Sequence, residues 1–548
     1  MYNFNEVQTL QNIRTRFKDV WDHKTTGNTG DLMPVYWKEI IPGDFVKLDV
    51  DTLVKMTTPS FQTMDNLYCD IHFYFVPRRL VWKHFKNFMG EKSVGPHETE
   101  PEYTIPRTTA PEGGWAENTI ADYLGVPTKK DGAYIDSAYL RAYALICNEW
   151  YRDQNRQDLI DISDGDENIV GSNGSNYVTD IIGGGKCFKA AKLHDYFTSS
   201  LLTPTGRETV YLPLGLQAPV YSSTDNGLTL YSQTGQKGPL YLTNGSNAIL
   251  SGTNGSVGVY NDSGETVDTY DGLRLPKRSE NINSGVYADL ANATAATVNQ
   301  LRLAFQLQKI FESNNIRGHR YIEQLKTRWN VTPSDATLQR PEFLGGKRFP
   351  LNMQMVVQSS STNVDSPLGQ VSGFSNTLYK DSYFSHGFEE HGILMGVCVI
   401  RHDRTYQQGL SIFFQRKNFE DFYTPEFQNL GERAIKNSEI FFSGDEVKDN
   451  EAFGFQEYAA EYRSTPNRVS GQFRSNATNS FDFWHYADDY SETPVNGEYW
   501  IMENPDSVNR TLTVTSEVAN QFYFDFHFIE TNVRTIPPHS IPGFIDHH

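Results

Sequence analysis

Three segments in which apolar and polar residues alternate strictly lie near the two ends of the 548-residue chain. They are Phe45–Met56, Leu67–Phe75 and Asn520–Val533, and a period of two predicts β-strands with one buried face. In the second segment Asp70 and Tyr74 fall on the face expected to meet solvent. Because strands of one style stand near both ends, we expect one sheet system that both ends complete.

Two further segments predict strands in the middle of the chain. Leu351–Val357 alternates in the same way, whereas Ile393–Ile400 is continuously apolar and is therefore expected to be buried on both faces. All these strands are far apart along the chain. Connections of that length are uncommon unless they fold themselves.

Two segments of helical period lie within these connections. Ser137–Tyr151 carries apolar residues three and four positions apart, and Asp136 precedes it as an N-cap. In Val298–Phe311 the apolar residues cover more than half of a helical wheel, which predicts a helix buried on two sides. Either a partner subunit or another insertion of the same chain could cover the second side. The residues that we expect at a subunit interface are Leu301, Phe305 and Phe311.

Polar stretches divide the long connections. Residues 161–185 are expected to form a polar surface loop. Residues 215–285 are rich in Gly, Ser and Asn, and the Asn-Gly steps at Asn226, Asn244 and Asn254 predict hairpins and turns in a surface insertion. Residues 286–345 are the helical part of this insertion, and residues 405–518 form a second long insertion before the final strand, 519–533.

Charge and composition exclude several classes of protein. With 48 Lys and Arg against 67 Asp and Glu the net charge is −19, which excludes a protein that coats nucleic acid by bulk positive charge. The four cysteines form no CxxC pair, so we expect reduced thiols. No apolar run approaches the roughly 20 residues needed to span a bilayer, and no export signal is present. We expect a soluble chain without membrane insertion.

No motif predicts catalysis or a bound cofactor. The H-G-F-E-E-H run from His386 to His391 has one residue too many for the H-x-x-E-H zinc arrangement, and its glycines disfavour a helix. Phosphate-binding loops and nucleophile elbows are likewise missing from the sequence. We therefore expect neither an enzyme nor a metal site nor a cofactor.

The most basic local patch combines cations with aromatic residues. Its members, expected to face DNA, are Arg78, Arg79, Lys83, Lys86 and Trp82. Charge together with ring stacking is how proteins hold single-stranded nucleic acid. The alternative is an ordinary short helix that buries its apolar stripe, Val81, Phe85 and Phe88, and turns its cations to water. The sequence leaves both interpretations open.

Several segments carry a family resemblance. They include G-D-F-V-K-L-D-V from Gly43, T-P-S-F-Q-T-M-D-N-L from Thr58, F-Y-F-V-P-R-R-L-V-W from Phe73, S-D-A-T-L-Q-R-P-E-F-L-G-G from Ser334 and F-G-F-Q-E-Y-A-A-E-Y-R from Phe453. In order and content they resemble the major capsid protein of microviruses, small single-stranded DNA bacteriophages, and especially the gokushovirus branch. The matching segments extend over nearly all of the chain outside the two polar insertions.

The resemblance implies a mainly β fold, an eight-stranded viral jelly roll whose long inter-strand insertions contain α-helices, with residues 1–548 as one capsid domain. It implies self-assembly of sixty copies into a T=1 icosahedral shell around a circular single-stranded DNA, in a virion assembled in the host bacterial cytoplasm. The other partners it implies are a small basic DNA-binding protein, further phage structural proteins, and a host surface receptor.

In that family the insertion that matches residues 215–285 builds a protrusion near the three-fold axes, where host attachment would take place. A rival hypothesis rests only on the abundance of Trp and Tyr. It is a β-rich carbohydrate-binding or carbohydrate-active protein.

Overall fold

The computed structural model describes residues 13–95, 97–99, 101–204, 298–360, 367–428 and 430–539. It also gives the backbone of five short strands, β8 (Val220–Ser222), β9 (Thr229–Ser232), β10 (Lys237–Pro239), β11 (Leu273–Arg274) and β12 (Val286–Ala288). Asn226, Asn244 and Asn254 lie outside the described residues. The chain divides into two compact units, Met1–Arg207 with Glu312–His548, and Glu208–Phe311.

Eight strands of the first unit form two four-stranded antiparallel sheets. They are β1 (Thr15–Gly27), β2 (Met33–Ile40), β3 (Phe45–Met56), β4 (Leu67–Pro77), β13 (Glu342–Pro350), β16 (Thr377–Gly387), β17 (Gly392–His402) and β22 (Phe522–Arg534). The sheet orders are β1-β22-β3-β16 and β13-β4-β17-β2. Numbered along the chain these orders are 1-8-3-6 and 5-4-7-2, the two Greek keys of a jelly roll. The predicted fold is confirmed.

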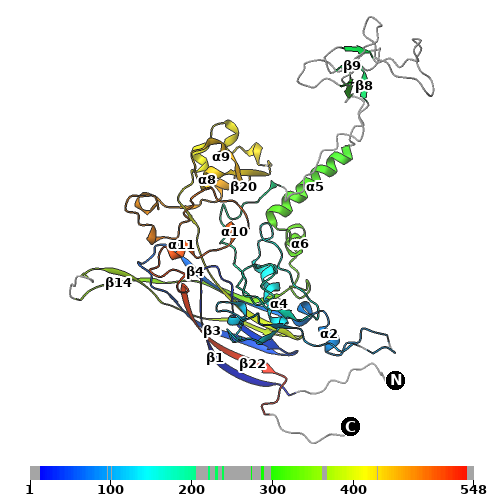
Figure 1. Ribbon diagram of the computed structural model, residues 1–548, viewed down its shortest axis with the longest axis vertical. Coiled ribbons are helices and arrows are strands. Elements are labelled where there is room, and N and C mark those ends of the chain that lie inside the picture. The colour runs from blue at the N-terminus through cyan, green and yellow to red at the C-terminus, as the bar shows by residue number, and fades with distance from the viewer. Residues whose placement is uncertain are drawn as a thin grey trace. The chain divides into compact units, whose positions relative to one another are not determined.

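The first sheet follows the predicted alternation. Along β3 every second side chain is buried, and on β22 Phe522, Phe524, Phe526 and Phe528 all point into the core. The rings of the last three stack in sequence with centroids 5.6 and 6.0 Å apart. Strand β22 lies between β1 and β3, so the two ends of the chain close one sheet, as predicted (Figure 1).

The two central strands of the second sheet, β4 and β17, are buried on both faces. Ile393–Ile400 lies in β17 and is buried throughout, as predicted. Asp70 and Tyr74 of β4, predicted to meet solvent, are also buried, so that prediction is wrong. The reason is a covering layer from the long insertion, because Tyr74 packs on Trp150 with ring centroids 5.5 Å apart.

The first part of the connection from β4 to β13, before residue 208, supplies that covering layer. The connection contains α1 (Arg78–Val81), α2 (Phe85–Phe88), β5 (Arg107–Thr109), α3 (Ile120–Tyr123), β6 (Tyr134–Asp136), α4 (Ser137–Ile146), the π-helical turn η1 (Cys147–Tyr151), β7 (Ile169–Val170), α5 (Val298–Arg317) and α6 (Tyr321–Trp329). Asp136 caps α4 by accepting a hydrogen bond from the Ala138 N–H at 2.9 Å, as predicted. Within the 161–185 segment Tyr177 and Ile181 are buried in the main core, so this loop is less exposed than predicted.

The connection from β17 to β22 holds many short elements. They are β18 (Thr405–Tyr406), α7 (Ile412–Gln415), η4 (Phe419–Asp421), η5 (Pro425–Phe427), β19 (Glu432–Lys436), α8 (Asn437–Ile440), α9 (Glu446–Asn450), β20 (Ala452–Glu457), η6 (Ala460–Tyr462), β21 (Asn467–Arg468), η7 (Gly471–Phe473), η8 (Asp482–Trp484), α10 (Glu498–Ile501) and α11 (Asp506–Asn509). A second small core joins this insertion to residues 191–197 of the first one. Its members include Tyr196, Phe197, Ile440, Phe453 and Ile501.

The segment Leu351–Val357, predicted as a strand with one buried face, behaves differently. Its strand is β14 (Met353–Val357), which among the described strands pairs with β15 (Val371–Ser375) alone. Beyond Met353 the side chains of β14 are exposed on both faces. Alternation alone did not show that this pair stands outside the sandwich (Figure 1).

Candidate assembly and nucleic-acid surfaces

Two of the five residues predicted to face DNA are buried inside the chain. Arg78 is only 6% exposed and forms ion pairs with Asp136 at 2.8 Å and Glu39 at 3.3 Å. The Trp82 ring is 1% exposed, and its Nε1–H donates to Asp166 at 2.6 Å. Neither side chain is accessible to a strand of DNA, so the prediction is wrong for these two.

The other three residues differ in their availability. Arg79 donates two hydrogen bonds to Glu390, at 2.7 and 3.0 Å, so its charge is already matched. Lys83 and Lys86 are exposed. Of the stripe Val81, Phe85 and Phe88, only Val81 is fully buried, and Phe88 is 42% exposed.

The acidic partners of this cluster come from distant parts of the chain. His84 contacts Asp166 at 2.8 Å, and the backbone N–H of Lys83 donates to the carbonyl of Asp164 at 3.0 Å. Of the carboxylates that pair with this cluster, only Asp166 comes from the 161–185 loop, whereas Arg78 pairs with Asp136 and Glu39 and Arg79 pairs with Glu390. The loop follows the basic patch by about 80 residues in the sequence, so the sequence does not show this contact. The one available signal is the high density of acidic residues in D-I-S-D-G-D-E.

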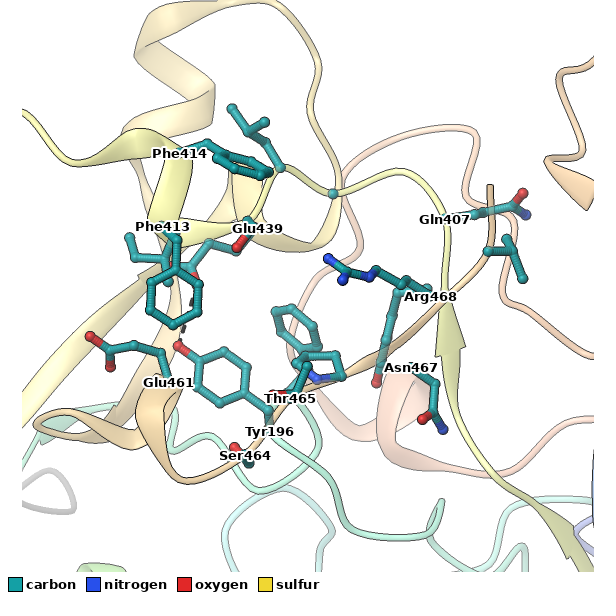
Figure 2. A pocket seen from close by; sticks show the side chains of 18 of the residues that line it. Tyr196, Gln407, Phe413, Phe414, Glu439, Glu461, Ser464, Thr465, Asn467 and Arg468 are labelled. Atoms are coloured by element: carbon teal, nitrogen blue, oxygen red, sulfur yellow. Dashed lines mark hydrogen bonds between the residues drawn. The ribbon is translucent and has the colours of Figure 1, made fainter. Parts of the chain in front are cut away.

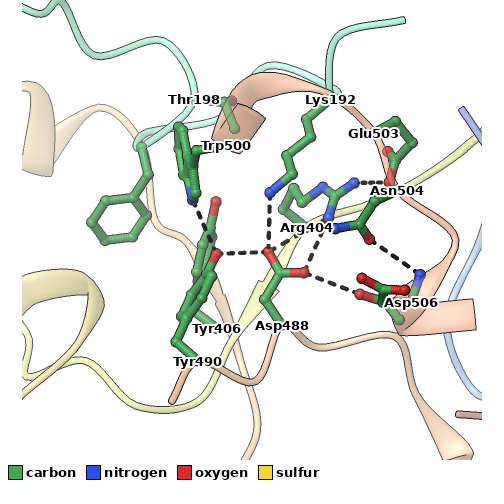
Figure 3. Close-up of polar contacts among 12 residues, drawn as sticks. Lys192, Thr198, Arg404, Tyr406, Asp488, Tyr490, Trp500, Glu503, Asn504 and Asp506 are labelled. Carbon is green, nitrogen blue, oxygen red and sulfur yellow. Dashed lines mark hydrogen bonds and ion pairs between the residues drawn. The ribbon is translucent and has the colours of Figure 1, made fainter. Parts of the chain in front are cut away.

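A buried ionic cluster, which the sequence did not reveal, lies just beyond the end of β17 (Figure 3). Asp488 accepts from Arg404 at 3.1 Å and from the Tyr490 hydroxyl at 2.8 Å, and Lys192 lies 3.7 Å away. A second carboxylate, Glu503, contacts the same guanidinium. The cluster links both insertions to the jelly roll, because Lys192 lies in the first insertion, Asp488 in the second, and Arg404 just after β17.

Electrostatics favour the charged forms in this cluster. Burial opposes ionisation of Asp488, but the charges of Lys192 and Arg404 outweigh it and lower the pKa of the carboxyl. Burial, helped by Arg404, lowers the pKa of the neighbouring His402. Removing either partner would leave a buried charge without its counter-ion, which is strongly destabilising, so the network holds these segments together.

A cleft of about 790 Å³ opens beside the second core, between β18, α7 and β21 (Figure 2). Tyr196 and Phe413 contribute aromatic surface, and Figure 2 shows Arg468 across the cleft from Phe413 and Glu461. Burial raises the pKa of Glu439, in the cleft wall, to about 7. The Tyr196 hydroxyl donates to this carboxyl at 3.3 Å.

Next to the cleft lies an exposed aromatic patch. Its members are Phe413, Phe414, Phe419, Phe422, Tyr423 and Tyr462, each between 43% and 76% exposed. The Arg416 guanidinium stacks over Phe413, Phe422 and Tyr462 at 4.7, 4.9 and 5.1 Å from the ring centroids. Aromatic residues together with Arg are enriched where proteins meet, so this patch is a candidate contact surface.

The residues predicted for a subunit interface lie on α5. Leu301 and Phe305 are exposed and Phe311 is partly buried. Within the described parts of the chain no group of three or more side chains is placed to bind a metal ion. The same residues include no helix that is long and apolar enough to cross a membrane.

Comparison with known proteins identifies the family. The family described as "Capsid protein (F protein)" matches residues 5–544. The chain belongs to this capsid protein family. It is 35% identical to capsid protein VP1 of Bdellovibrio phage phiMH2K, over 99% of this chain and 97% of the relative. It is 37% identical to VP1 of Spiroplasma virus 4, over 95% and 94%, and 33% identical to VP1 of Chlamydia phage 1, over 98% and 97%.

Membership decides between the two hypotheses that the sequence left open. The capsid protein is a structural component of a virion and not an enzyme, and the carbohydrate-active rival is set aside. Its function is to associate with further copies of itself to form a shell. The surfaces described above therefore matter for what they contact.

Proposed function

We propose that sixty copies of this chain form a T=1 icosahedral shell around a circular single-stranded DNA, assembled in the cytoplasm of a host bacterium. The observation that carries the proposal is the complete jelly-roll strand order in a chain that matches capsid proteins over nearly its whole length. All four cysteines are free and buried, which suits assembly in a reducing compartment.

The net charge of the chain constrains how it can contact the genome. A chain of net charge −19 holds DNA only through local cations or through a basic partner. Lys83 and Lys86 are the accessible cations of the predicted cluster, with Arg79 beside them in an ion pair. We assign the main neutralisation to a small basic phage protein, with other phage structural proteins completing the particle.

Helix α5 and the insertion 215–285 have separate roles in this proposal. Leu301, Phe305 and Phe311 of α5 meet a neighbouring subunit. The insertion 215–285, with Asn226, Asn244 and Asn254, forms a protrusion that contacts a host surface receptor. Its richness in Gly, Ser and Asn supports an exposed and adaptable loop.

Electron microscopy of particles formed by the chain tests the shell. We expect icosahedral particles whose protein mass is sixty times 62.3 kDa and whose DNA resists nuclease. Particles of another subunit number, or a chain that stays monomeric in infected cells, would contradict the proposal.

The genome contact is tested separately. The double variant Lys83→Glu/Lys86→Glu is expected to form shells that hold several-fold less DNA, measured by absorbance at 260 nm against 280 nm. The matched control, Lys448→Glu, reverses the charge of another exposed lysine and is expected to package normally. Equal DNA content in both variants would remove Lys83 and Lys86 from the genome contact.

A further inference from the structure

The β14–β15 hairpin exposes apolar side chains on both of its faces. Residues opposite each other in an antiparallel pair share a face, so Val356 lies on one face with Phe374, through the pairs Val356↔Ser372 and Gln354↔Phe374. Met355 and Val357 lie on the other. All four side chains are 45–52% exposed. A two-stranded hairpin of this kind is at best marginally stable in water.

Only the base of the hairpin is attached to the jelly roll. The backbone N–H of Asn352 donates to the Thr377 hydroxyl at 2.8 Å, and the Gln62 side chain donates to the Met353 carbonyl at 3.3 Å. At Gly373 the backbone comes so close to Phe61 that a Cβ would lie 2.6 Å from the Phe61 carbonyl oxygen. These contacts fix the hairpin to the jelly roll, while its four apolar side chains remain 45–52% exposed.

The charge of the hairpin indicates what covers it. Between Met353 and Ser375 the only ionisable residue is Asp365, in a chain that carries −19. Two copies of an acidic chain repel each other, so contact between them is favoured where charge is absent. The centres of protein interfaces are depleted of charged residues for the same reason.

We infer that the β14–β15 hairpin is an arm that a second copy of this chain covers. The inference rests on the proposed function, because a shell supplies the second copy. Figure 1 shows the hairpin extending from the sandwich, where it can reach a neighbour. Burial of both apolar faces at once would then stabilise the hairpin and the contact together.

A thiol placed on the arm tests the inference directly. The four native cysteines are buried, so Val356→Cys adds the one readily accessible thiol among the described residues. We expect maleimide to label it at least tenfold more slowly in assembled shells than in folded free subunits. Val495→Cys, at another exposed valine, is the control for the labelling reaction itself in the free subunit. Equal labelling of the arm thiol in both states would overturn the inference.

The identity of the cover is tested by cross-linking. Benzophenone-maleimide on Val356→Cys is expected to give, on illumination of shells, a product of twice the 62.3 kDa chain mass. A product with a smaller phage protein, or with DNA, would overturn the inference.

The double variant Val356→Lys/Phe374→Lys should lower the yield of shells at least tenfold and leave the circular dichroism and melting of the free subunit unchanged. Val495→Lys is the matched control. Normal shells from the double variant would contradict the inference that a second copy covers the hairpin. Particles of another symmetry in which the arm thiol is still protected would contradict only the T=1 proposal.

Discussion

Asp70 is a charged residue inside a strand whose pattern predicts an exposed side chain. Arg348 donates to it at 2.6 and 2.9 Å, and Arg401 also contacts it. Burial opposes its ionisation, but these two guanidiniums outweigh that effect and lower the pKa of the carboxyl. The stability that this group contributes is therefore complete above the unfolded pKa of about 4 and is lost as the pH falls below it.

We predict that Asp70→Ala lowers the free energy of unfolding by about 3 kcal/mol, because it leaves two guanidiniums without their partner. Urea denaturation of the free subunit at pH 7 measures the loss. Asp70→Asn keeps an acceptor of similar shape and is expected to lose less. An alanine variant as stable as the wild type would show that Arg348, which is largely exposed, turns to solvent without cost.

Glu439 has the opposite shift. Burial raises its pKa to about 7, so the folded chain keeps a proton that the unfolded chain releases above about pH 4.3. The stability of the folded state accordingly falls as the pH rises from about 4.3 to 7, and stays lowered above it.

The variant Glu439→Gln removes this ionisation and keeps the side-chain size. We predict that it is more stable than the wild type at pH 8, by about 3 kcal/mol, and nearly equal to it at pH 4.5. Urea denaturation at the two pH values gives the comparison. A difference that does not change with pH would mean that the carboxyl ionises normally in the cleft.

At the scale of elements, Gly373 fixes how the hairpin leaves the sandwich. A Cβ there would lie 2.6 Å from the Phe61 carbonyl oxygen, and moving backbone atoms to relieve this contact costs free energy. We predict that Gly373→Ala lowers the melting temperature of the subunit by about 1–2 °C, since the unfolding entropy of a chain of this length converts a loss of about 1–2 kcal/mol into a shift of that size. Calorimetry of the free subunit measures it.

Gly387 of β16 is the matched control. The nearest atom to a Cβ at that position is 3.8 Å away, so Gly387→Ala is expected to leave Tm nearly unchanged. If both variants had the same Tm, the backbone near Phe61 would be able to move away from the added Cβ at little cost in free energy.

The sequence predicted elements better than their surroundings. Strands β3, β4, β17 and β22 and the Asp136 cap follow from period and residue type, which are local properties. The strand β14 was found by the same alternation, but alternation does not say whether a second layer exists. The arrangement of the strands in two packed sheets could be predicted only from the family resemblance.

The candidate site was predicted less well for a physical reason. Arg78 and Trp82 are close in sequence to Lys83 and Lys86, yet their partners Asp136 and Asp166 come from other elements. A run of cations shows where charge is, not whether the fold neutralises it. The buried cluster around Asp488 has the same character, since its members come from three separate parts of the chain.

At the scale of the whole molecule, net charge sets the conditions for assembly. Copies that each carry −19 repel one another over a distance that falls from about 30 Å at 0.01 M salt to about 3 Å at 1 M. We predict that purified subunits associate faster as NaCl is raised from about 0.05 to 0.5 M. Static light scattering follows the reaction. Slower association at high salt would instead show that ion pairs between copies dominate the contacts.

The ladder between β1 and β22 pairs Thr15 with Arg534 and Gly27 with Phe522. Among the described strands β1 is hydrogen-bonded to β22 alone, and β3 keeps an unpaired edge until β22 is added. During translation the ribosome makes β1 first and β22 last of all the jelly-roll strands. A nascent chain that ends before β22 lacks a central strand of this sheet, so we expect particles to contain only chains that include β22.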